Sequence, residues 1–301
     1  MNGIPQKQNT PKQLDRLAAT SQLYLGAKCI LAAQIILSIP AVLGLSALAA
    51  IDSRLDPYAA YWGVTVAIVD AAILEPWQQR LKRRAALTQE LFDCELFELP
   101  WHELATGPRP STEAVAKEAS RYRRKYPKPS WLENWYPVAV GQLPLELARI
   151  ICQRINCWWD GELRRRYSFW VIVVVIVLSI LVILLGVVGG FSVGKFFQVV
   201  LAPLIPALLL GYRQFTANRD AAAKLDDLKA HAENFWNLAI QNQLPDEELL
   251  NRSRELQDEI FDNRQNSPLI FNWIYRRFRT DQENQMKQGA EELIQQATHT
   301  Q

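Results

Sequence analysis

The chain has 301 residues, of which 49% are hydrophobic and 21% are charged, and its net charge is +2 at pH 7. This charge gives no argument for nucleic-acid binding, so neither DNA nor RNA polymers are expected as partners. Four cysteines without an extracellular disulfide framework indicate reduced thiols, and the polar segment 1–28 lacks the apolar core of a secretory signal.

The first apolar stretch predicts a helical hairpin in a membrane. Residues 29–51, CILAAQIILSIPAVLGLSALAAI, have the length and composition of a spanning helix and include Gln34. Residues 57–74 predict a second span, for which a buried core helix is the alternative because Asp70 lies within it. The linker between the two is short, which favours the hairpin.

A second hairpin follows later in the chain. Residues 169–191 carry no charge and exceed the roughly 20 apolar residues that a bilayer-crossing helix needs. Residues 196–212 predict a shorter span with Pro203 and Pro206, which a membrane helix tolerates when neighbouring groups satisfy the freed carbonyls. The linker 192–195 is tight, so these two spans also form a hairpin.

The positive-inside rule orients all four spans in the same way. The tight linkers contribute only Arg54 and Lys195, whereas basic residues gather at the other ends of the spans. These residues are Lys7, Lys12, Arg16, Lys28, Arg80, Lys82, Arg83, Arg84, Arg164, Arg165, Arg166, Arg213 and Arg219. We therefore expect both termini and both large polar parts to be cytoplasmic.

The polar part between the hairpins is expected to be mainly helical. A helix capped by Ser111 or Thr112 should run to about Lys125, and SWLE (130–133) has the spacing of a capping box. After Pro144, helix-favouring residues continue without a break into the third span.

The C-terminal part is expected to be helical as well. Residues 213–241 should prolong the fourth span, and Pro245 with the acidic residues after it marks another helix start. On that helix one face is apolar, formed by Leu249, Leu256, Ile260 and Phe261. Residues 213–301 contain 11 basic and 15 acidic residues, against 16 and 11 in residues 76–168, which favours docking of the two parts.

Taken together, these patterns predict an all-α integral membrane protein with four transmembrane helices in two hairpins and one helical cytoplasmic domain. The expected parts are an N-terminal cytoplasmic segment 1–28, a first hairpin 29–75, a cytoplasmic region 76–168, a second hairpin 169–212 and a cytoplasmic C-terminal region 213–301.

Motifs for nucleotide hydrolysis, metal binding and catalysis are weak. GGFSVGK (189–195) has the spacing of a phosphate-binding loop, but a membrane helix precedes it and Phe196 follows where the loop needs Ser or Thr. Cys152 and Cys157 lie on different faces of a helix and no histidine pair accompanies them, so we expect packing thiols. No metal, cofactor or catalytic residue is expected, and the protein is not expected to be an enzyme.

Asp70 is the most informative single residue. An ionisable group within a span is costly and usually faces a bundle interior, a partner charge or water. Asp70 is therefore a candidate pore or gating residue, with Gln34 on the first span as its candidate polar partner. The alternatives are a place near the inner interface or a structural hydrogen bond.

RYRRKYPK (121–128) interleaves cations with tyrosines. Such a cluster can bind phosphates and stack on bases, or it can rest on anionic lipid headgroups, as juxtamembrane basic clusters do.

Asp160 lies four residues before Arg164, which predicts a helical ion pair. The neighbouring Trp158 and Trp159 can contact lipid headgroups, another helix or a stacked base, and the sequence does not choose among these roles.

Six stretches carry a family resemblance along the whole chain. They are IPQKQN (4–9), LYLGAK (23–28), FDCELFELPW (92–101), NWYP (134–137), ARIICQRINCWWD (148–160) and QDEIFDNRQNSPLIFNWIYRRFR (257–279). With them the chain resembles the S-4TM family, four-transmembrane pore-forming effectors of bacterial antiviral systems.

The resemblance implies a partner synthase that makes a cyclic oligonucleotide, a regulatory ligand sensed by the cytoplasmic part, and permeabilisation of the bacterial inner membrane. Four spans with few polar residues cannot line an ion path within one protomer, so we expect a homo-oligomer in the lipid bilayer. A membrane sensor or scaffold that recruits a soluble partner is the alternative. The candidate nucleotide ligands are Arg121, Arg123, Arg124, Lys125, Tyr126, Arg154 and Trp158.

Overall fold

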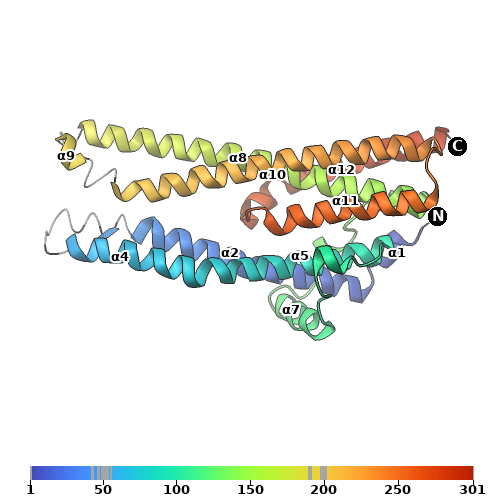
Figure 1. Ribbon diagram of the computed structural model, residues 1–301, viewed down its shortest axis with the longest axis horizontal. Coiled ribbons are helices and arrows are strands. Elements are labelled where there is room, and N and C mark those ends of the chain that lie inside the picture. The colour runs from blue at the N-terminus through green and yellow to red at the C-terminus, as the bar shows by residue number, and fades with distance from the viewer. Residues whose placement is uncertain are drawn as a thin grey trace. The chain divides into compact units, whose positions relative to one another are not determined.

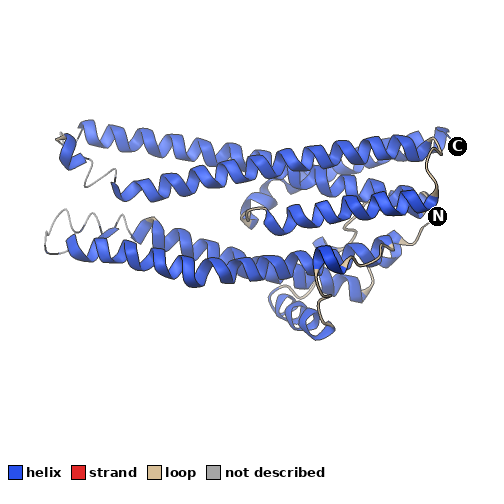
Figure 2. Ribbon diagram, viewed as in Figure 1, coloured by secondary structure: helices blue, strands red, loops and turns tan. Residues whose placement is uncertain are grey.

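A computed structural model of the chain describes residues 2–41, 44–45, 48, 54, 56–188, 192–196 and 202–300. Within these ranges every regular element is a helix and there is no strand (Figure 2). The predicted helical fold class is therefore confirmed for the part of the chain that the structure describes.

Most of the chain lies in a few long helices (Figure 1). The α-helices are α1 Ile4–Lys7, α2 Pro11–Ser38, α4 Asp56–Val69, α5 Glu75–Phe97, α6 Glu103–Thr106, α7 Thr112–Lys125, α8 Leu145–Val188, α9 Val193–Phe196, α10 Ala202–Ile240, α11 Asp246–Asn266 and α12 Asn272–Thr300. A π-helical turn, η2 (Asp70–Leu74), joins α4 to α5, and two short 3-10 turns, η3 (Ser130–Leu132) and η4 (Val138–Gln142), precede α8.

The chain divides into two compact units. Unit 1 comprises Met1–Leu25, Leu81–Arg164 and Asp220–Gln301, and unit 2 comprises Gly26–Arg80 and Arg165–Arg219. Four helices, α2, α5, α8 and α10, contribute residues to both units. Unit 1 combines most of the region between the hairpins with most of the C-terminal part, so the predicted docking of these two parts is confirmed.

Unit 1 is built around one large apolar core. Its largest fully buried side chains include Phe92 and Phe97 of α5, Ile150 of α8, Trp236 of α10, and Tyr136 from the segment before α8. The rings of Phe97 and Tyr136 lie 5.3 Å apart, centroid to centroid. Because burying one large apolar side chain contributes about 1.5–3 kcal/mol, this core supplies most of the packing that holds α5, α8 and α10 together.

The N-terminal helix α1 is bound to the segment before α8 by paired hydrogen bonds. The Gln8 side chain donates to the Tyr136 carbonyl at 3.1 Å and accepts from the Tyr136 N–H at 2.8 Å. Gly141 lies so close to Pro5 that an added β-carbon would come within 2.7 Å of its ring. Glycine is therefore required at this contact.

In unit 2 the helices of each predicted hairpin contact one another. Trp62 of α4 donates its indole N–H to the Leu37 carbonyl of α2 at 3.3 Å. Gly211 of α10 lies so close to Val175 of α8 that an added β-carbon would overlap that side chain. Short contacts of this kind, through small residues, are typical of packed membrane helices.

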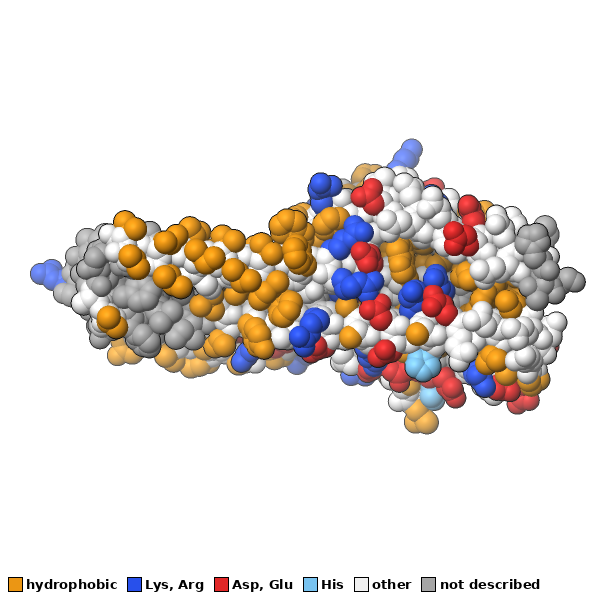
Figure 3. Space-filling model, turned by 90° about the horizontal axis from the view of Figure 1, so that it is seen from above, with side chains coloured by type: hydrophobic (Ala, Val, Ile, Leu, Met, Phe, Trp, Pro, Cys, Tyr) orange, Lys and Arg blue, Asp and Glu red, His pale blue; other side chains and the backbone are white. Residues whose placement is uncertain are grey.

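Large apolar side chains cover the outside of unit 2. Exposed examples are Val64, Ile68, Ile73, Val174, Ile176, Leu181 and Ile183. Figure 3 shows hydrophobic side chains gathered over the visible face of this unit, whereas charged side chains gather over the visible face of unit 1. An apolar exterior of this extent marks a surface that meets lipid or another protein.

Several predicted helix starts are confirmed and one is wrong. The Ser111 hydroxyl accepts the Ala114 N–H at 3.2 Å as the cap of α7, and Pro245 precedes α11, whose predicted apolar face is buried. The capping box predicted at 130–133 does not exist, because η3 is a single 3-10 turn without a side-chain cap. Prolines on both sides, at 129 and 137, leave this segment too short for a helix.

By length and composition, α2 is the helix in the described part of the chain that could cross a bilayer. Each predicted span includes residues or side chains outside the described part, and so does the GGFSVGK loop. The helical continuity predicted for the third span is confirmed through Val188, because α8 has no break between Leu145 and that residue.

Candidate functional site

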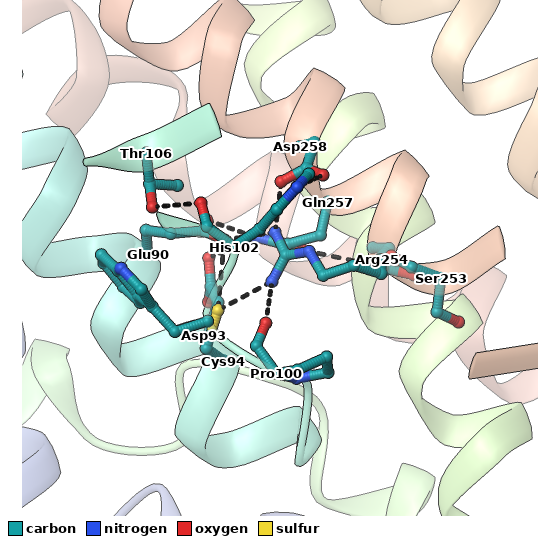
Figure 4. Close-up of polar contacts among 12 residues, drawn as sticks. Glu90, Asp93, Cys94, Pro100, His102, Thr106, Ser253, Arg254, Gln257 and Asp258 are labelled. Carbon is teal, nitrogen blue, oxygen red and sulfur yellow. Dashed lines mark hydrogen bonds and ion pairs between the residues drawn. The ribbon is translucent and has the colours of Figure 1, made fainter. Parts of the chain in front are cut away.

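A group of buried charged and amide side chains lies between α5 and α11, and we call it the buried charge cluster: Glu90 and Asp93 with Arg254, Gln257 and Arg264. Arg254 Nη2 lies 2.7 Å from Glu90 Oε1, and Arg264 Nη1 lies 3.0 Å from Asp93 Oδ2. Gln257 donates its amide to Glu90 Oε2 at 2.8 Å. Figure 4 shows the Arg254 guanidinium group among its partners Glu90, Cys94, Pro100 and Asp258.

The sequence spacing explains how the buried charge cluster forms. Glu90 and Asp93 are three residues apart on α5, and Arg254 and Gln257 are three apart on α11, with Arg264 seven further on. Residues at these separations share one helix face. Each helix therefore brings its polar groups to a single stripe, and the two stripes meet inside an otherwise apolar contact.

Two further parts of the chain join this cluster: the segment before α8, through Tyr136, and α8 itself. Tyr136 donates its hydroxyl to Asp93 Oδ1 at 2.7 Å and accepts from the Asn156 amide at 2.8 Å. Gln153 of α8 donates to Gln257 Oε1 at 3.1 Å and to the Ser253 carbonyl at 2.7 Å. The network therefore fixes α8, α5 and α11 to one another through buried polar groups.

The cluster is electrostatically balanced, with two carboxylates facing two guanidinium groups. Burial raises the pKa of the Asp93 carboxyl, although Arg264 opposes the shift. Burial lowers the pKa of Arg264, but the nearby Asp93 charge outweighs this and the pKa lies above its ordinary value. Because Glu90, Asp93 and Gln257 are closed to solvent, the cluster serves to position helices.

Unit 2 contains a second group of polar side chains, which we call the unit 2 polar cluster: Gln34, Asp70, Glu75 and Gln78. The Gln34 amide donates to Asp70 Oδ1 at 2.7 Å and to Glu75 Oε2 at 3.4 Å. Gln78 donates to Gln34 Oε1 at 2.8 Å. The predicted pairing of Gln34 with Asp70 is therefore confirmed, and both glutamines are buried.

Asp70 begins the π-helical turn η2. Pro76 has no N–H to donate to the carbonyl of Ala72, four residues earlier, and its ring crowds that carbonyl. The proline therefore gives a local cause for the turn. Single π-helical turns occur frequently at functional sites, because they re-aim a side chain without ending the helix.

Three of the seven predicted nucleotide ligands are engaged in ion pairs within unit 1. These pairs are Arg121 with Glu118 at 3.2 Å, Arg123 with Asp15 at 2.8 Å, and Arg154 with Glu233 at 2.7 Å. Their guanidinium groups already neutralise carboxylates of the protein, which reduces what they can offer to an anionic ligand.

The end of α7 presents the remaining basic candidates. Arg124 and Lys125 are exposed, and Lys125 Nζ lies 5.6 Å from the centroid of the Tyr126 ring. Tyr126 packs edge-on against Trp131, with centroids 5.5 Å apart. Trp158, on α8, packs against the neighbouring Trp159 instead, at 6.4 Å.

Other predictions for the ARIICQRINCWWD stretch are confirmed. Cys152 and Cys157 are buried thiols, and Arg164 Nε lies 2.9 Å from Asp160 Oδ2. The Trp159 ring lies 6.2 Å from that of Tyr275 on α12, which favours a helix contact for this tryptophan. Within the described residues, no group of three His, Cys, Asp or Glu side chains is placed to hold a metal ion.

Sequence reasoning missed the buried charge cluster, although its residues lie in or beside the recognised motifs. Asp93 belongs to FDCELFELPW, Gln153 to ARIICQRINCWWD, and Gln257 and Arg264 to the C-terminal motif. One signal was available in the sequence: charged residues recur at helical spacing on faces that are otherwise apolar. This pattern indicates that the charges are buried against a polar partner. NWYP and IPQKQN meet in the same way, through Tyr136 and Gln8.

A chain whose described elements are all helices, with an apolar exterior on one unit and a buried polar network in the other, belongs to the class of membrane-associated helical proteins. The family model described as "SMODS-associating 4TM effector domain" matches residues 2–293, and the chain belongs to this family. It is also 24% identical over 277 residues to the "Probable CBASS effector molecule" of Bacillus cereus (strain VD146), covering 90% of this chain and 91% of that protein. No solved structure matches the chain.

Proposed function

We propose that the protein is a nucleotide-regulated, pore-forming membrane effector of bacterial antiphage defence. It permeabilises the inner membrane, and the infected cell stops growing or dies. Membership of a 4TM effector family and the name of the Bacillus relative, a probable CBASS effector molecule, support the effector role. Residues 29–75 and 169–212 lie in the membrane on this proposal, with both termini in the cytoplasm.

The residues at the ends of three predicted spans support this topology. Each has an exposed aromatic residue close to an exposed arginine: Trp77 and Arg80 on α5, Trp170 and Arg165 on α8, and Tyr212 and Arg213 on α10. Aromatic residues are enriched at the bilayer interface, and arginines on its cytoplasmic side.

The unit 2 polar cluster carries the pore proposal. A carboxylate paired with buried amides is costly to place in a unit whose exterior is apolar, so a function has to compensate for it. One protomer offers too few polar groups to surround an ion path, and the pore therefore forms by assembly of several copies. Asp70 lines or gates it, and the π-helical turn sets the direction of its side chain.

The pore is tested in cells that express the protein with and without the neighbouring nucleotide synthase. A membrane-potential dye reports leakage for wild type, Asp70→Asn and Asp70→Leu at matched membrane abundance, with Ile73→Leu on the same turn as control. We expect depolarisation that depends on the synthase, altered by both Asp70 changes and not by the control. Absence of depolarisation in every condition would favour a membrane sensor or scaffold instead.

For the nucleotide, the exposed end of α7 is the proposed contact. Arg124 and Lys125 supply charge for phosphates, and the Tyr126–Trp131 pair supplies a surface on which a base can stack. Ligand binding there shifts the pore equilibrium only by its differential affinity for the open and closed states.

Calorimetry on detergent-solubilised protein, titrated with the cyclic oligonucleotide of the neighbouring synthase, tests this contact. The double change Arg124→Glu and Lys125→Glu should weaken binding at least tenfold, about 1.4 kcal/mol. Lys117→Glu is the matched control, because Lys117 is exposed on the same helix outside the basic cluster. Undiminished affinity of the double variant would place the ligand elsewhere.

A further inference from the structure

The first turns of α12 present two unusual side chains outward. Trp273 is 70% exposed, and Arg277, four residues later, is exposed on the same helix face. The opposite face is occupied, because Ile274 is buried and the Tyr275 ring packs on Trp159 of α8. One side of this segment is thus held by the protein, and a large aromatic with a cation remains on the other.

The connection that precedes α12 is tied down by two buried cations. Arg164 Nη1 of α8 donates to the Pro268 carbonyl at 3.0 Å, and Lys82 Nζ of α5 donates to the Ser267 carbonyl at 3.2 Å. Lys82 and Arg164 are both buried. Cations at the C-terminal end of a helix are favourable, so the end of α11 is fixed to these points on α5 and α8.

The proposed membrane topology places these attachment points at a defined distance from the apolar core of the bilayer. The apolar run of α8 begins at Phe169, five residues after Arg164, which is about 7.5 Å along an α-helix. The polar layer on each side of a bilayer core is of similar thickness, about 5–8 Å. Pro268, one hydrogen bond from Arg164, therefore lies at the level of the lipid headgroups, and Trp273 follows five residues later.

We propose that the start of α12 is a peripheral membrane contact, in which Trp273 inserts among the headgroups and Arg277 pairs with the phosphate of an anionic lipid. Tryptophan favours this interface because its ring is apolar and its N–H is polar. A guanidinium group binds phosphate with two parallel hydrogen bonds, and anionic cytoplasmic lipids attract such cations. The inference rests on the proposed membrane topology.

Such a contact would bind a helix that does not cross the membrane to the bilayer surface. α11 carries three members of the buried charge cluster, and its end is fixed to α5 and α8. Lipid contact by α12 would therefore hold the α11–α12 connection at the membrane surface, beside the helices that enter it. Leakage would then depend on the charge of the lipid.

Fluorescence of full-length protein in nanodiscs tests the contact. The difference between wild type and Trp273→Phe isolates the emission of Trp273, and Trp170→Phe does the same for Trp170. In nanodiscs of brominated phosphatidylglycerol we expect both tryptophans to lose most of their emission. Arg277→Glu should restore most of the Trp273 emission and leave that of Trp170 unchanged, whereas Lys287→Glu, exposed further along α12, should change neither.

The outcomes separate this inference from the topology beneath it. Quenching of Trp170 without quenching of Trp273 would overturn the α12 contact alone, including the case in which a second copy of the chain shields Trp273. Quenching of neither tryptophan would overturn the membrane topology itself. Unaltered Trp273 quenching in Arg277→Glu would overturn the assignment of an anionic headgroup.

Discussion

Arg252 and Arg254 lie on the same helix and each faces an acidic residue, but burial makes their contributions to stability different. Arg252 Nη2 lies 2.6 Å from Glu248 Oε1, with both side chains about 40% exposed. Arg254 meets Glu90 at 2.7 Å, where the carboxylate is fully buried. Water can replace the first partner and cannot reach the second.

Arg254→Ala should therefore lower the free energy of unfolding by about 3–5 kcal/mol, because it removes the close charge partner of buried Glu90 and leaves only Arg264, at 4.0 Å. Arg252→Ala should lower it by less than about 1 kcal/mol. Thermal unfolding of the two variants in detergent measures the difference. Equal midpoints would show that the buried charge cluster does not hold α11 on α5.

The thiols of Cys94, Cys152 and Cys157 should resist alkylation in the folded protein. Burial raises the pKa of each, to about 12 for Cys157, and the thiolate is the reactive form. Treatment with iodoacetamide at pH 8, followed by mass spectrometry, should label these three only after denaturation. Labelling of any of them in the native state would contradict the packing role.

Elements in unit 1 are fastened by polar contacts at their edges as well as by the apolar core. Glu95 of α5 accepts hydrogen bonds from Lys12, at 2.7 Å, and from Arg16 of α2. Net charge alone predicts that basic residues of the region between the hairpins pair with acidic residues of the C-terminal part, and the Arg154–Glu233 pair agrees with this. In the buried charge cluster the acidic residues come from the region between the hairpins and the arginines from the C-terminal part. Individual positions on a helix face, and not net charge, therefore decide which charges meet.

This contact between α2 and α5 should weaken in acid. Burial raises the pKa of Glu95, but the hydrogen bonds from Lys12 and Arg16 outweigh burial and hold the pKa below its ordinary value. A carboxyl whose pKa is lowered by folding stabilises the folded state at pH values above its pKa in the unfolded chain, about 4.3 for glutamate. This stabilisation is lost as the pH falls through the pKa of the folded state. Glu95→Gln should therefore lower the thermal midpoint at pH 7 and flatten its fall between about pH 5 and pH 3.

Glu133→Gln, an exposed change in the same unit, is the control for this pH series. Its curve should follow that of wild type throughout. A Glu95→Gln curve with the same slope as wild type would mean that acid destabilisation arises elsewhere.

Four long helices, α2, α5, α8 and α10, contribute residues to both units. A helix is stiff along its axis because each backbone N–H is hydrogen-bonded to the carbonyl four residues earlier. On the proposed function, these continuous helices connect the residues proposed to sense the nucleotide with the residues proposed to cross the membrane. The proposed regulation requires that continuity.

Insertion of two glycines between Arg164 and Arg165, inside α8, should uncouple leakage from the nucleotide. The insertion interrupts the helix and rotates the residues after it, while the groups proposed to bind the nucleotide are untouched. We expect calorimetry to report wild-type nucleotide affinity and the membrane-potential dye to report leakage that no longer responds to the synthase. The same insertion after Gly107, between α6 and α7, is the control and should retain the response.

The helical class, the cap of α7, the start of α11, the Asp160–Arg164 pair and the family could all be predicted from the sequence. Each of these depends on residues close together in the chain, whose spacing follows from helix geometry. It also predicted that Gln34 would meet Asp70, because polar residues in apolar helices have few alternative partners.

Which distant residues contact one another could not be predicted from the sequence and is seen in the folded structure. Glu90 and Arg254 are 164 positions apart, and nothing in either local pattern selects one for the other. The same holds for Arg164 and Pro268, and for the ion pairs that engage Arg121, Arg123 and Arg154. Long-range pairing depends on how helices pack in three dimensions. Helical periodicity predicts which residues share one face of a helix, but not which other helix packs against that face.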